Sequence, residues 1–256
     1  MSRFVFVLIG FVFFGSTAAH SESPYIKTSL VKGVLNVVVL GDSLANGLHQ
    51  GLTQLNKDRD DIKTIRKSKV NTGLVRRDRY DWNKAAKQFA HSGKYQAAVV
   101  LLGLNDMQTI REKGKAHHFK TDGWRSRYMA RAEAMMRDLK SGGLAVYWVS
   151  NPIVTEKHHQ EEIFYLNGIY SEVAAKVGVR FIDTWKPLGT EDGKYTPFYT
   201  GADGKKQQIR HRDGVHFTSD GYLIFANFVN HIMLQDLQRA HPKEKTKEKT
   251  EELGTP

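Results

Sequence analysis

Five short apolar stretches recur along the chain, at residues 35–40, 62–70, 97–102, 144–150 and 179–183. Three of them, the first, third and fourth, are nearly continuous apolar runs without alternation of polar positions. Such runs are typical of parallel strands that are covered on both faces. The second stretch carries more charge, so we expect it to lie towards an edge of the sheet.

Helical patterns occupy most of the intervening sequence. In residues 124–139 the apolar positions recur at helical spacing, and Ser141-Gly142-Gly143 provides a stop. The other predicted helices are residues 45–55, 82–91, 164–177 and 222–237. Strands that alternate with helices predict a three-layer α/β/α sandwich around a five-stranded parallel sheet, joined by right-handed crossovers.

One segment departs from this alternation. Asp192-Gly193 and Asp203-Gly204 are turn signals, and residues 195–199 and 206–210 flank the second of them. We therefore predict a β-hairpin inserted before the last helix.

The two ends of the chain differ from the body, which we expect to form one domain over residues 33–241. Arg3, the apolar residues 4–14 and the small residues 15–19 resemble a secretory signal peptide. The apolar run is shorter than the roughly 20 residues that span a bilayer. We expect a signal peptide over residues 1–21, cleavage between 19 and 23, and a periplasmic or secreted product without stable membrane insertion. The charged, low-complexity tail 242–256 is expected to be disordered.

The formal net charge is +11, and the chain contains no cysteine. Disulfides, a thiol nucleophile and cysteine-ligated zinc are therefore excluded. The positive surface either attracts an anionic envelope polymer or is simply solvated. The basic residues are scattered rather than arranged in a stripe, so we expect no nucleic-acid partner.

Three short polar motifs follow predicted strands. The carboxyl ends of parallel strands meet at one edge of the sheet, where ligands bind in such folds. The motifs are Gly41-Asp42-Ser43-Leu44, Asn71-Thr72-Gly73 and Gly103-Leu104-Asn105-Asp106.

A serine at a strand-to-helix turn exposes its hydroxyl, but it needs a base within hydrogen-bond reach to act as a nucleophile. Just before the last predicted helix, Asp213 precedes His216 by three residues. A carboxylate at this spacing can bind one imidazole nitrogen and leave the other free for Ser43, as in a Ser-His-Asp triad. Taken singly, the motifs also fit a helix N-cap, a turn and a capped loop. Their joint occurrence at strand ends and helix starts favours an active site.

In these motifs the chain resembles the GDSL/SGNH hydrolases, over residues 38–228. The resemblance implies a flavodoxin-like fold and a serine esterase without a cofactor. It implies that Ser43 is the nucleophile and that Asp213 and His216 complete the triad. It also implies an oxyanion hole formed by the backbone N–H groups of Ser43 and Gly73 and the side chain of Asn105. Asp42 is expected to support the turn.

Three further side chains are candidates for substrate contact. Arg76 follows Gly73 closely and could meet an anionic substrate, and Tyr195 and Tyr199 belong to the predicted hairpin near His216. Solvated charge and packing of the hairpin are the alternatives. We expect no metal site, because the histidines do not show the spacing of a ligand set. The histidines and carboxylates considered are His117, His118, His158, His159, Glu161 and Glu162.

The function predicted from these features is hydrolysis of acyl esters, with O-acetyl groups on an envelope glycan as a plausible substrate. An O-acyltransferase with the same triad is the nearest alternative. A non-catalytic glycan-binding module and a metal-dependent phosphoesterase are more distant ones. The complete set of triad residues favours an enzyme.

Overall fold

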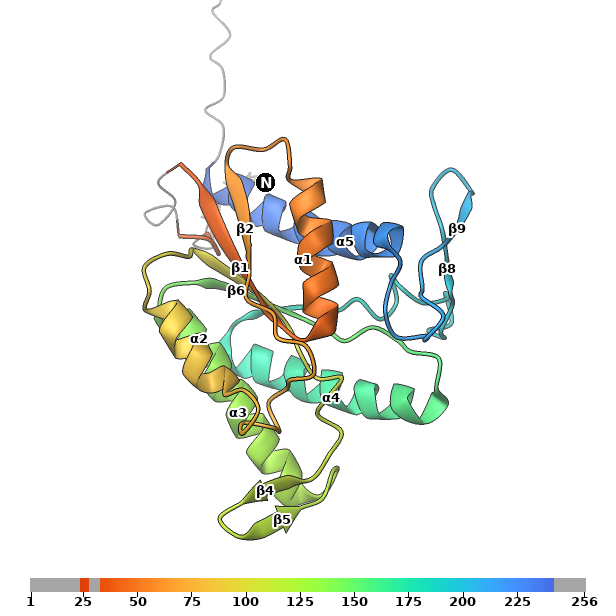
Figure 1. Ribbon diagram of the computed structural model, residues 1–256. Helices are drawn as coiled ribbons and strands as arrows, with labels where there is room; N and C mark the ends of the chain where they lie inside the picture. Colours follow the sequence, from red (N-terminus) through yellow and green to blue (C-terminus); the bar gives the residue numbers. More distant parts are fainter. Residues whose placement is uncertain (1–23, 28–32, 242–256) are drawn as a thin grey trace, which may run out of the picture.

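The computed structural model describes residues 24–27 and 33–241. Its centre is a five-stranded parallel sheet in the order β2-β1-β3-β6-β7 (Figure 1). The strands are β1 (Leu35–Gly41), β2 (Ile62–Arg66), β3 (Ala97–Leu101), β6 (Ala145–Val149) and β7 (Arg180–Ile182). This confirms the predicted sheet and the edge position of its most polar strand. That strand ends at Arg66, paired with Val39, rather than at residue 70; beyond it only the N–H groups of Lys67 and Lys69 bond to β1, at the carbonyl oxygens of Val39 and Gly41.

Helices cover both faces of the sheet. α1 (Ser43–Leu55) and α5 (Ser219–Ala240) pack on one face, and α2 (Trp82–Ala90), α3 (Asp122–Ser141) and α4 (Lys157–Val177) pack on the other (Figure 1). Successive strand residues point to opposite faces, so Val37 and Val39 join one core while Val38 and Leu40 join the other. The three-layer prediction is therefore confirmed.

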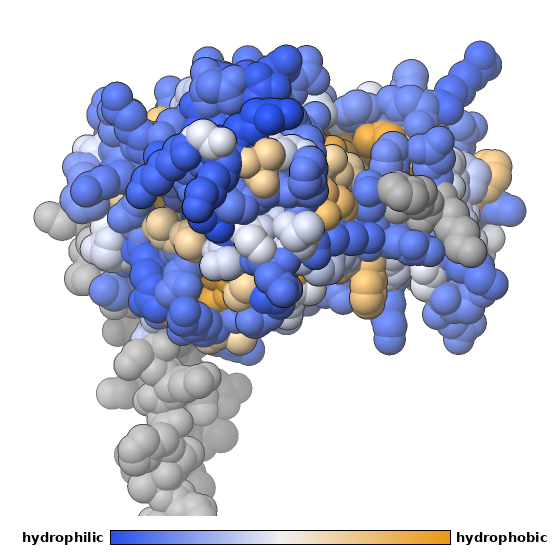
Figure 2. Space-filling view, turned by 90° about the horizontal axis from the view of Figure 1, so that it is seen from below, coloured by the Kyte–Doolittle hydropathy of each residue, from blue (hydrophilic) through white to orange (hydrophobic). Residues whose placement is uncertain are grey.

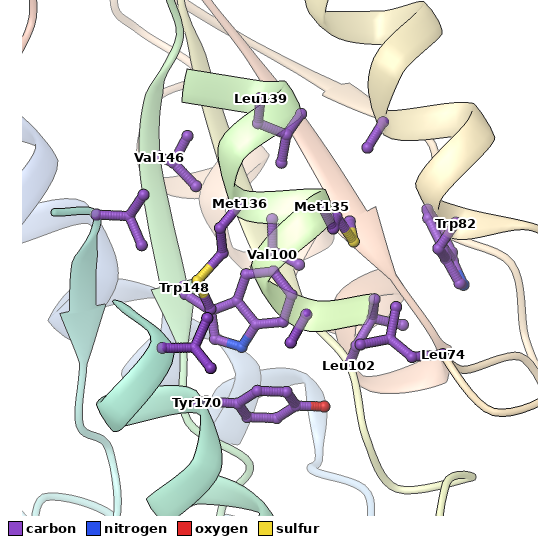
Figure 3. Packing of buried hydrophobic residues seen from close by; sticks show 14 of the residues in the cluster. Leu74, Trp82, Val100, Leu102, Met135, Met136, Leu139, Val146, Trp148 and Tyr170 are labelled. Atoms are coloured by element: carbon purple, nitrogen blue, oxygen red, sulfur yellow. The ribbon is translucent and has the colours of Figure 1, made fainter. Parts of the chain in front are cut away.

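The core under α3 contains the largest buried aromatic side chains. Trp148 lies between Met136 of α3 and Tyr170 of α4 (Figure 3), and Trp148 and Tyr170 are fully buried. Burying a large apolar side chain stabilises a fold by roughly 1.5–3 kcal/mol. Leu74, from the loop after β2, points into the same core beside Leu102 (Figure 3). This loop is thus anchored to the body of the protein.

Two β-hairpins extend from this framework. β8 (Phe198–Thr200) and β9 (Lys206–Gln208) form the predicted hairpin, with shorter strands than expected. A second hairpin, β4 (Ile110–Glu112) and β5 (Lys115–His117), was not predicted, because three-residue strands leave little apolar pattern. Its turn residues Lys113 and Gly114 both have positive φ, as type I′ turns require.

The helix that differs most from expectation is α4. It begins at Lys157, seven residues before the predicted start at 164. Its first turns are polar (Lys-His-His-Gln-Glu-Glu), so the apolar spacing that marks a helix begins only at Ile163.

The predicted signal peptide, residues 1–21, and the charged tail, residues 242–256, lie outside the described residues. Within residues 24–27 and 33–241, no helix combines the length and the apolar character needed to cross a bilayer.

Candidate active site

The turn from β1 into α1 places Ser43 at the start of a helix. Gly41 has φ 142°, and a Cβ at this position would lie 1.8 Å from the carbonyl oxygen of Leu101, so only glycine fits. Asp42 caps the helix, because its Oδ1 accepts a hydrogen bond from the N–H of Leu44 at 3.0 Å. Ser43 is the first residue of α1, where the helix dipole favours negative charge.

Asp42 is fully buried and connects this turn to the loop after β3. Burial raises the pKa of Asp42 to about 7, although the N–H groups of Leu44, Gly103 and Leu104 donate to its carboxylate. The nearby Asp106 raises this pKa further, because like charges repel. Asp42 thus supports the turn, as the sequence predicted.

The structure brings Ser43, His216 and Asp213 into one hydrogen-bonded chain. Nε2 of His216 lies 2.9 Å from Oγ of Ser43, although 173 positions separate the two residues in sequence. Nδ1 of His216 lies 2.7 Å from Oδ2 of Asp213. A carboxylate accepts hydrogen bonds, so it favours the tautomer with the proton on Nδ1 and leaves Nε2 as an acceptor.

Asp213 is held in its ionised form by its own loop. Burial acts to raise its pKa, but hydrogen bonds from the His216 side chain and from the N–H groups of Val215 and His216 lower the pKa of Asp213 to about 2. Asp213 therefore stays a carboxylate at neutral pH, where it can stabilise a protonated His216.

The loop that carries His216 is fixed by a buried arginine. The Arg210 guanidinium donates to the carbonyl oxygens of Val215 and Ile153, and its centre lies 3.8 Å from the ring centroid of Phe217. Burial lowers the pKa of Arg210 to about 10, so the group remains charged at neutral pH. Gly214 has φ 68°, and a Cβ there would overlap the side chain of Thr155.

The loop that carries Gly73 is held by two buried charged residues. The Asp106 carboxylate accepts from the N–H groups of Leu74 and Val75 at 2.9 and 2.8 Å, and from the Tyr128 hydroxyl at 2.8 Å. Arg131 of α3 donates to the carbonyl oxygens of Leu74 and Val75. Both the N–H and the carbonyl groups of Leu74 and Val75 are therefore bonded, which fixes the backbone directly after Gly73.

Gly73 itself touches the carboxylate. A Cβ at this position would lie 2.2 Å from Oδ1 of Asp106, so the close approach requires glycine. Asn105 joins the same assembly, because its Nδ2 donates to the carbonyl oxygen of Thr72 at 3.0 Å and lies 3.5 Å from Oδ2 of Asp42. Gly73 and Asn105 line one hollow of about 330 Å³. All five predicted catalytic and oxyanion residues thus lie at the carboxyl edge of the sheet.

The candidate substrate contacts divide into two groups. Arg76 lines the same hollow as Gly73 and Asn105. The ring centroid of Tyr195 lies 5.4 Å from the guanidinium carbon of Arg210, and Tyr199 packs against Phe228. The contacts of both tyrosines are those of side chains that secure the hairpin, and a role in substrate binding stays a prediction.

Among the described residues, no group of three or more His, Asp or Glu side chains is placed to hold a metal ion. Nδ1 of His159 lies 2.8 Å from a carboxylate oxygen of Glu156, and the side chain of His158 is not among those described.

Three residues that shape the site were not assigned a structural role from the sequence. Asp106 belongs to a recognised motif, yet the motif alone did not reveal that it binds the Gly73 loop. For Arg131 the sequence does indicate burial, because it is a charged residue on the apolar face of α3 that Tyr128, Ala132 and Met135 define. Arg210 lies in an irregular segment before Asp213, where no periodic pattern marks a buried side chain.

Comparisons with known proteins agree with this architecture. The profile of a family described as "Protein of unknown function (DUF459)" matches residues 36–231. A search of curated protein sequences found no match.

Several solved structures share the fold. A GDSL-like lipase from Bacteroides thetaiotaomicron is 16% identical, with a TM-score of 0.55 over 78% of this chain and 88% of that one. A catalytic mutant of an acetylxylan esterase from Geobacillus stearothermophilus is 13% identical, with a TM-score of 0.55 over 81% of this chain and 96% of that one. A carbohydrate esterase of family 3 from Talaromyces cellulolyticus is 12% identical, with a TM-score of 0.54 over 79% and 97%. At these identities the likeness establishes the fold, which is that of the GDSL/SGNH hydrolases.

Proposed function

The chain belongs to the family described as protein of unknown function (DUF459), and we propose that it is a serine ester hydrolase with Ser43 as its nucleophile. The observation that carries this proposal is the hydrogen-bonded chain from Ser43 Oγ through His216 to Asp213, with contacts of 2.9 and 2.7 Å. A fold shared with lipases and carbohydrate esterases supports the ester as the bond that is cleaved.

The first chemical step transfers the acyl group to the protein. Nε2 of His216 accepts the hydroxyl proton of Ser43 while Oγ attacks the ester carbonyl. The Asp213 carboxylate holds the imidazole in place and stabilises its protonated form. As the tetrahedral intermediate collapses, His216 returns the proton to the leaving alcohol, and an acyl-Ser43 ester remains.

The oxyanion that forms on the carbonyl oxygen needs hydrogen-bond donors. We assign this role to the backbone N–H groups of Ser43 and Gly73 and to the Asn105 amide. Their support is the position of Ser43 at the start of α1 and the common hollow that Gly73 and Asn105 line. Removing one such donor typically lowers turnover by about 10²–10³-fold.

The second step releases the acyl group. His216 takes a proton from water, the resulting hydroxide attacks the acyl-Ser43 carbonyl, and Ser43 recovers its proton. A sugar hydroxyl in place of water would make the protein an O-acyltransferase, so product analysis with and without an acceptor glycan separates the two.

We further propose that the natural ester is a short acyl group, such as acetyl, on a glycan of the cell envelope, and that the protein is exported. The hollow beside Gly73 is small, and most of its lining side chains are polar, which suits a short acyl group on a hydrophilic alcohol. The expected signal peptide supports export.

The test is hydrolysis of p-nitrophenyl acetate and butyrate by the wild-type protein and by Ser43→Ala and His216→Ala. We expect both variants to lose at least about 10³-fold in kcat/KM, because each removes a member of the triad. Ser141→Ala and His91→Ala are matched controls, since both residues are exposed and lie at the far ends of α3 and α2. Circular dichroism checks the fold of each variant. Undiminished activity in Ser43→Ala would exclude Ser43 as the nucleophile.

A further inference from the structure

The hollow next to Gly73 and Asn105 is lined by two arginines, Arg76 and Arg79. A larger hollow of about 910 Å³ lies next to it, because Arg76 and Gln108 line both. Seen from below the orientation of Figure 1, this end of the molecule is mainly hydrophilic, with small apolar areas between polar side chains (Figure 2). The hollow that Gly73 and Asn105 line therefore belongs to a polar surface rather than to an apolar channel.

The charge of the two hollows is unbalanced. Five arginines line them, against the three carboxylates Asp78, Asp81 and Glu112. Within the part of the chain that the structure describes, no carboxylate lies within ion-pair distance of Arg79. Arg76 pairs with Asp78 at 2.6 Å, but both side chains are exposed, at 39% and 64%. Such exposed pairs are weak, so a ligand can displace Asp78 from Arg76.

We propose that Arg76 and Arg79 form a subsite for an anionic group, a carboxylate or phosphate, on the alcohol part of the ester. This inference rests on the proposed function and narrows its substrate to an acidic glycan. The guanidinium fork fits a carboxylate or phosphate with two parallel hydrogen bonds. The larger hollow offers room for the bulky alcohol part, whereas a short acyl group needs only a small space.

The lining also disfavours a lipid substrate. Charged and polar side chains form most of the larger hollow, among them Arg77, Asp78, Arg111 and Glu112. A long acyl chain placed there would lose the favourable burial that an apolar wall provides. The anion and the hydrophilic alcohol therefore belong to the same, water-soluble part of the substrate.

The test compares two aryl acetates of similar size, 4-acetoxybenzoate with an anionic para group and methyl 4-acetoxybenzoate with a neutral one. The measured quantity is the ratio of kcat/KM for the charged ester to that for the neutral one. We expect a ratio of about five to ten for the wild type after correction for spontaneous hydrolysis, since one exposed ion pair changes affinity by a factor of roughly two to five. We expect the ratio to fall with Arg76→Gln and Arg79→Gln, and to approach one in the double variant.

Two further variants sharpen the test. Asp78→Asn removes the competitor of the ligand at Arg76, so it should raise the ratio. Arg59→Gln is the matched control, because Arg59 pairs with Asp61 at the same 2.6 Å and the same spacing of two residues, but at the amino end of β2. It should leave the ratio unchanged. In 0.3 M salt the wild-type ratio should decline, because the Debye length falls below about 10 Å.

The outcomes separate this inference from the proposed function. Hydrolysis of neither ester would count against the esterase itself. Hydrolysis of both esters at a ratio near one, unaffected by the Arg76 and Arg79 variants, would overturn the subsite while leaving the esterase intact. An equal fall with Arg59→Gln would also overturn it, because the effect would then come from overall surface charge.

Discussion

The two halves of the candidate active site are held in place by different means. On the Ser43 side, the positioning groups Asp42, Asp106 and Arg131 are buried within the sheet edge and its helices. On the His216 side, the Asp213 carboxylate lies in an exposed loop, where the side chains of His216 and Asp213 are 39% and 44% exposed. One half is part of the core, and the other is a surface loop secured by the buried Arg210.

This difference is visible in the two carboxylates that precede Ser43 and His216. Burial raises the pKa of Asp42 to about 7, whereas hydrogen bonds that outweigh burial lower the pKa of Asp213 to about 2. Asp42 takes up its proton near pH 7 and supports the fold. Asp213 stays charged at that pH and is suited to the proposed chemistry. Substitutions on the Ser43 side should therefore change stability and activity together, and those in the His216 loop should change mainly activity.

The largest effect is expected for Asp213→Asn. The asparagine amide can donate to Nδ1 of His216 and so favour the wrong tautomer, and it cannot stabilise the imidazolium. In a serine protease the same change lowers turnover about 10⁴-fold, and we expect a loss of about 10³–10⁴-fold in kcat here. The free energy of unfolding should change by less than about 1 kcal/mol, because both side chains of the pair are partly exposed to solvent. Turnover within threefold of the wild type would remove Asp213 from the triad.

A smaller loss of activity, coupled to a loss of stability, is expected for Asp106→Asn. The substitution leaves one acceptor oxygen in place of two for the N–H groups of Leu74 and Val75 and the Tyr128 hydroxyl. Leaving a buried donor unsatisfied costs about 1–3 kcal/mol. Urea unfolding should show a loss of about 2 kcal/mol, and kcat should fall by about tenfold or more as the Gly73 loop shifts.

Asp58→Asn serves as the control for that measurement, because Asp58 is exposed in the turn after α1. It should leave both quantities unchanged. If Asp106→Asn altered neither stability nor turnover, the Gly73 loop would not depend on the buried carboxylate.

A further prediction concerns the pH dependence of stability, which does not require any change in activity. The pKa of Asp42 is raised from its ordinary value of 3.8 to about 7, so its stabilising contribution is complete below about pH 4 and is lost as the pH rises to about 7. Asparagine does not titrate. As the pH rises from 4.5 to 7.5, the free energy of unfolding of the wild type should therefore fall relative to that of Asp42→Asn.

For Asp213 the sign is opposite. Its lowered pKa gives a contribution that is present above about pH 4 and is lost as the pH falls towards 2. The carboxylate of Asp213 itself should thus not titrate between pH 4.5 and 7.5, in contrast to that of Asp42. A pH-independent difference for Asp42→Asn would contradict the assignment of a raised pKa to Asp42.

Much of the fold followed from local sequence patterns. Continuous apolar runs marked the inner strands, and a glycine at the end of β1 and another after β3 marked the turns at the edge of the sheet. The proposed triad residues could be paired because Asp213 and His216 are only three positions apart and Ser43 lies in a recognisable motif. The β4–β5 hairpin and the start of α4 were missed, because their residues are polar or their strands too short to show a period.

The contacts that hold the site in place could not be predicted, since they join distant parts of the chain. Arg131 binds carbonyl groups 56 and 57 positions away, and Asp106 binds N–H groups 31 and 32 positions away. Arg210 reaches Ile153, 57 positions away. A sequence pattern shows which face of a helix is buried, but not which buried charge will meet which backbone group.

The most direct test of the central claim, that Ser43 is a nucleophile activated by His216, is reaction with a serine-directed organophosphonate followed by mass spectrometry of the intact protein and its peptides. We predict a single adduct on Ser43, absent from Ser43→Ala and formed much more slowly in His216→Ala. Control variants Ser141→Ala and His91→Ala should react like the wild type. An adduct on another residue, or undiminished labelling of Ser43→Ala, would contradict the account.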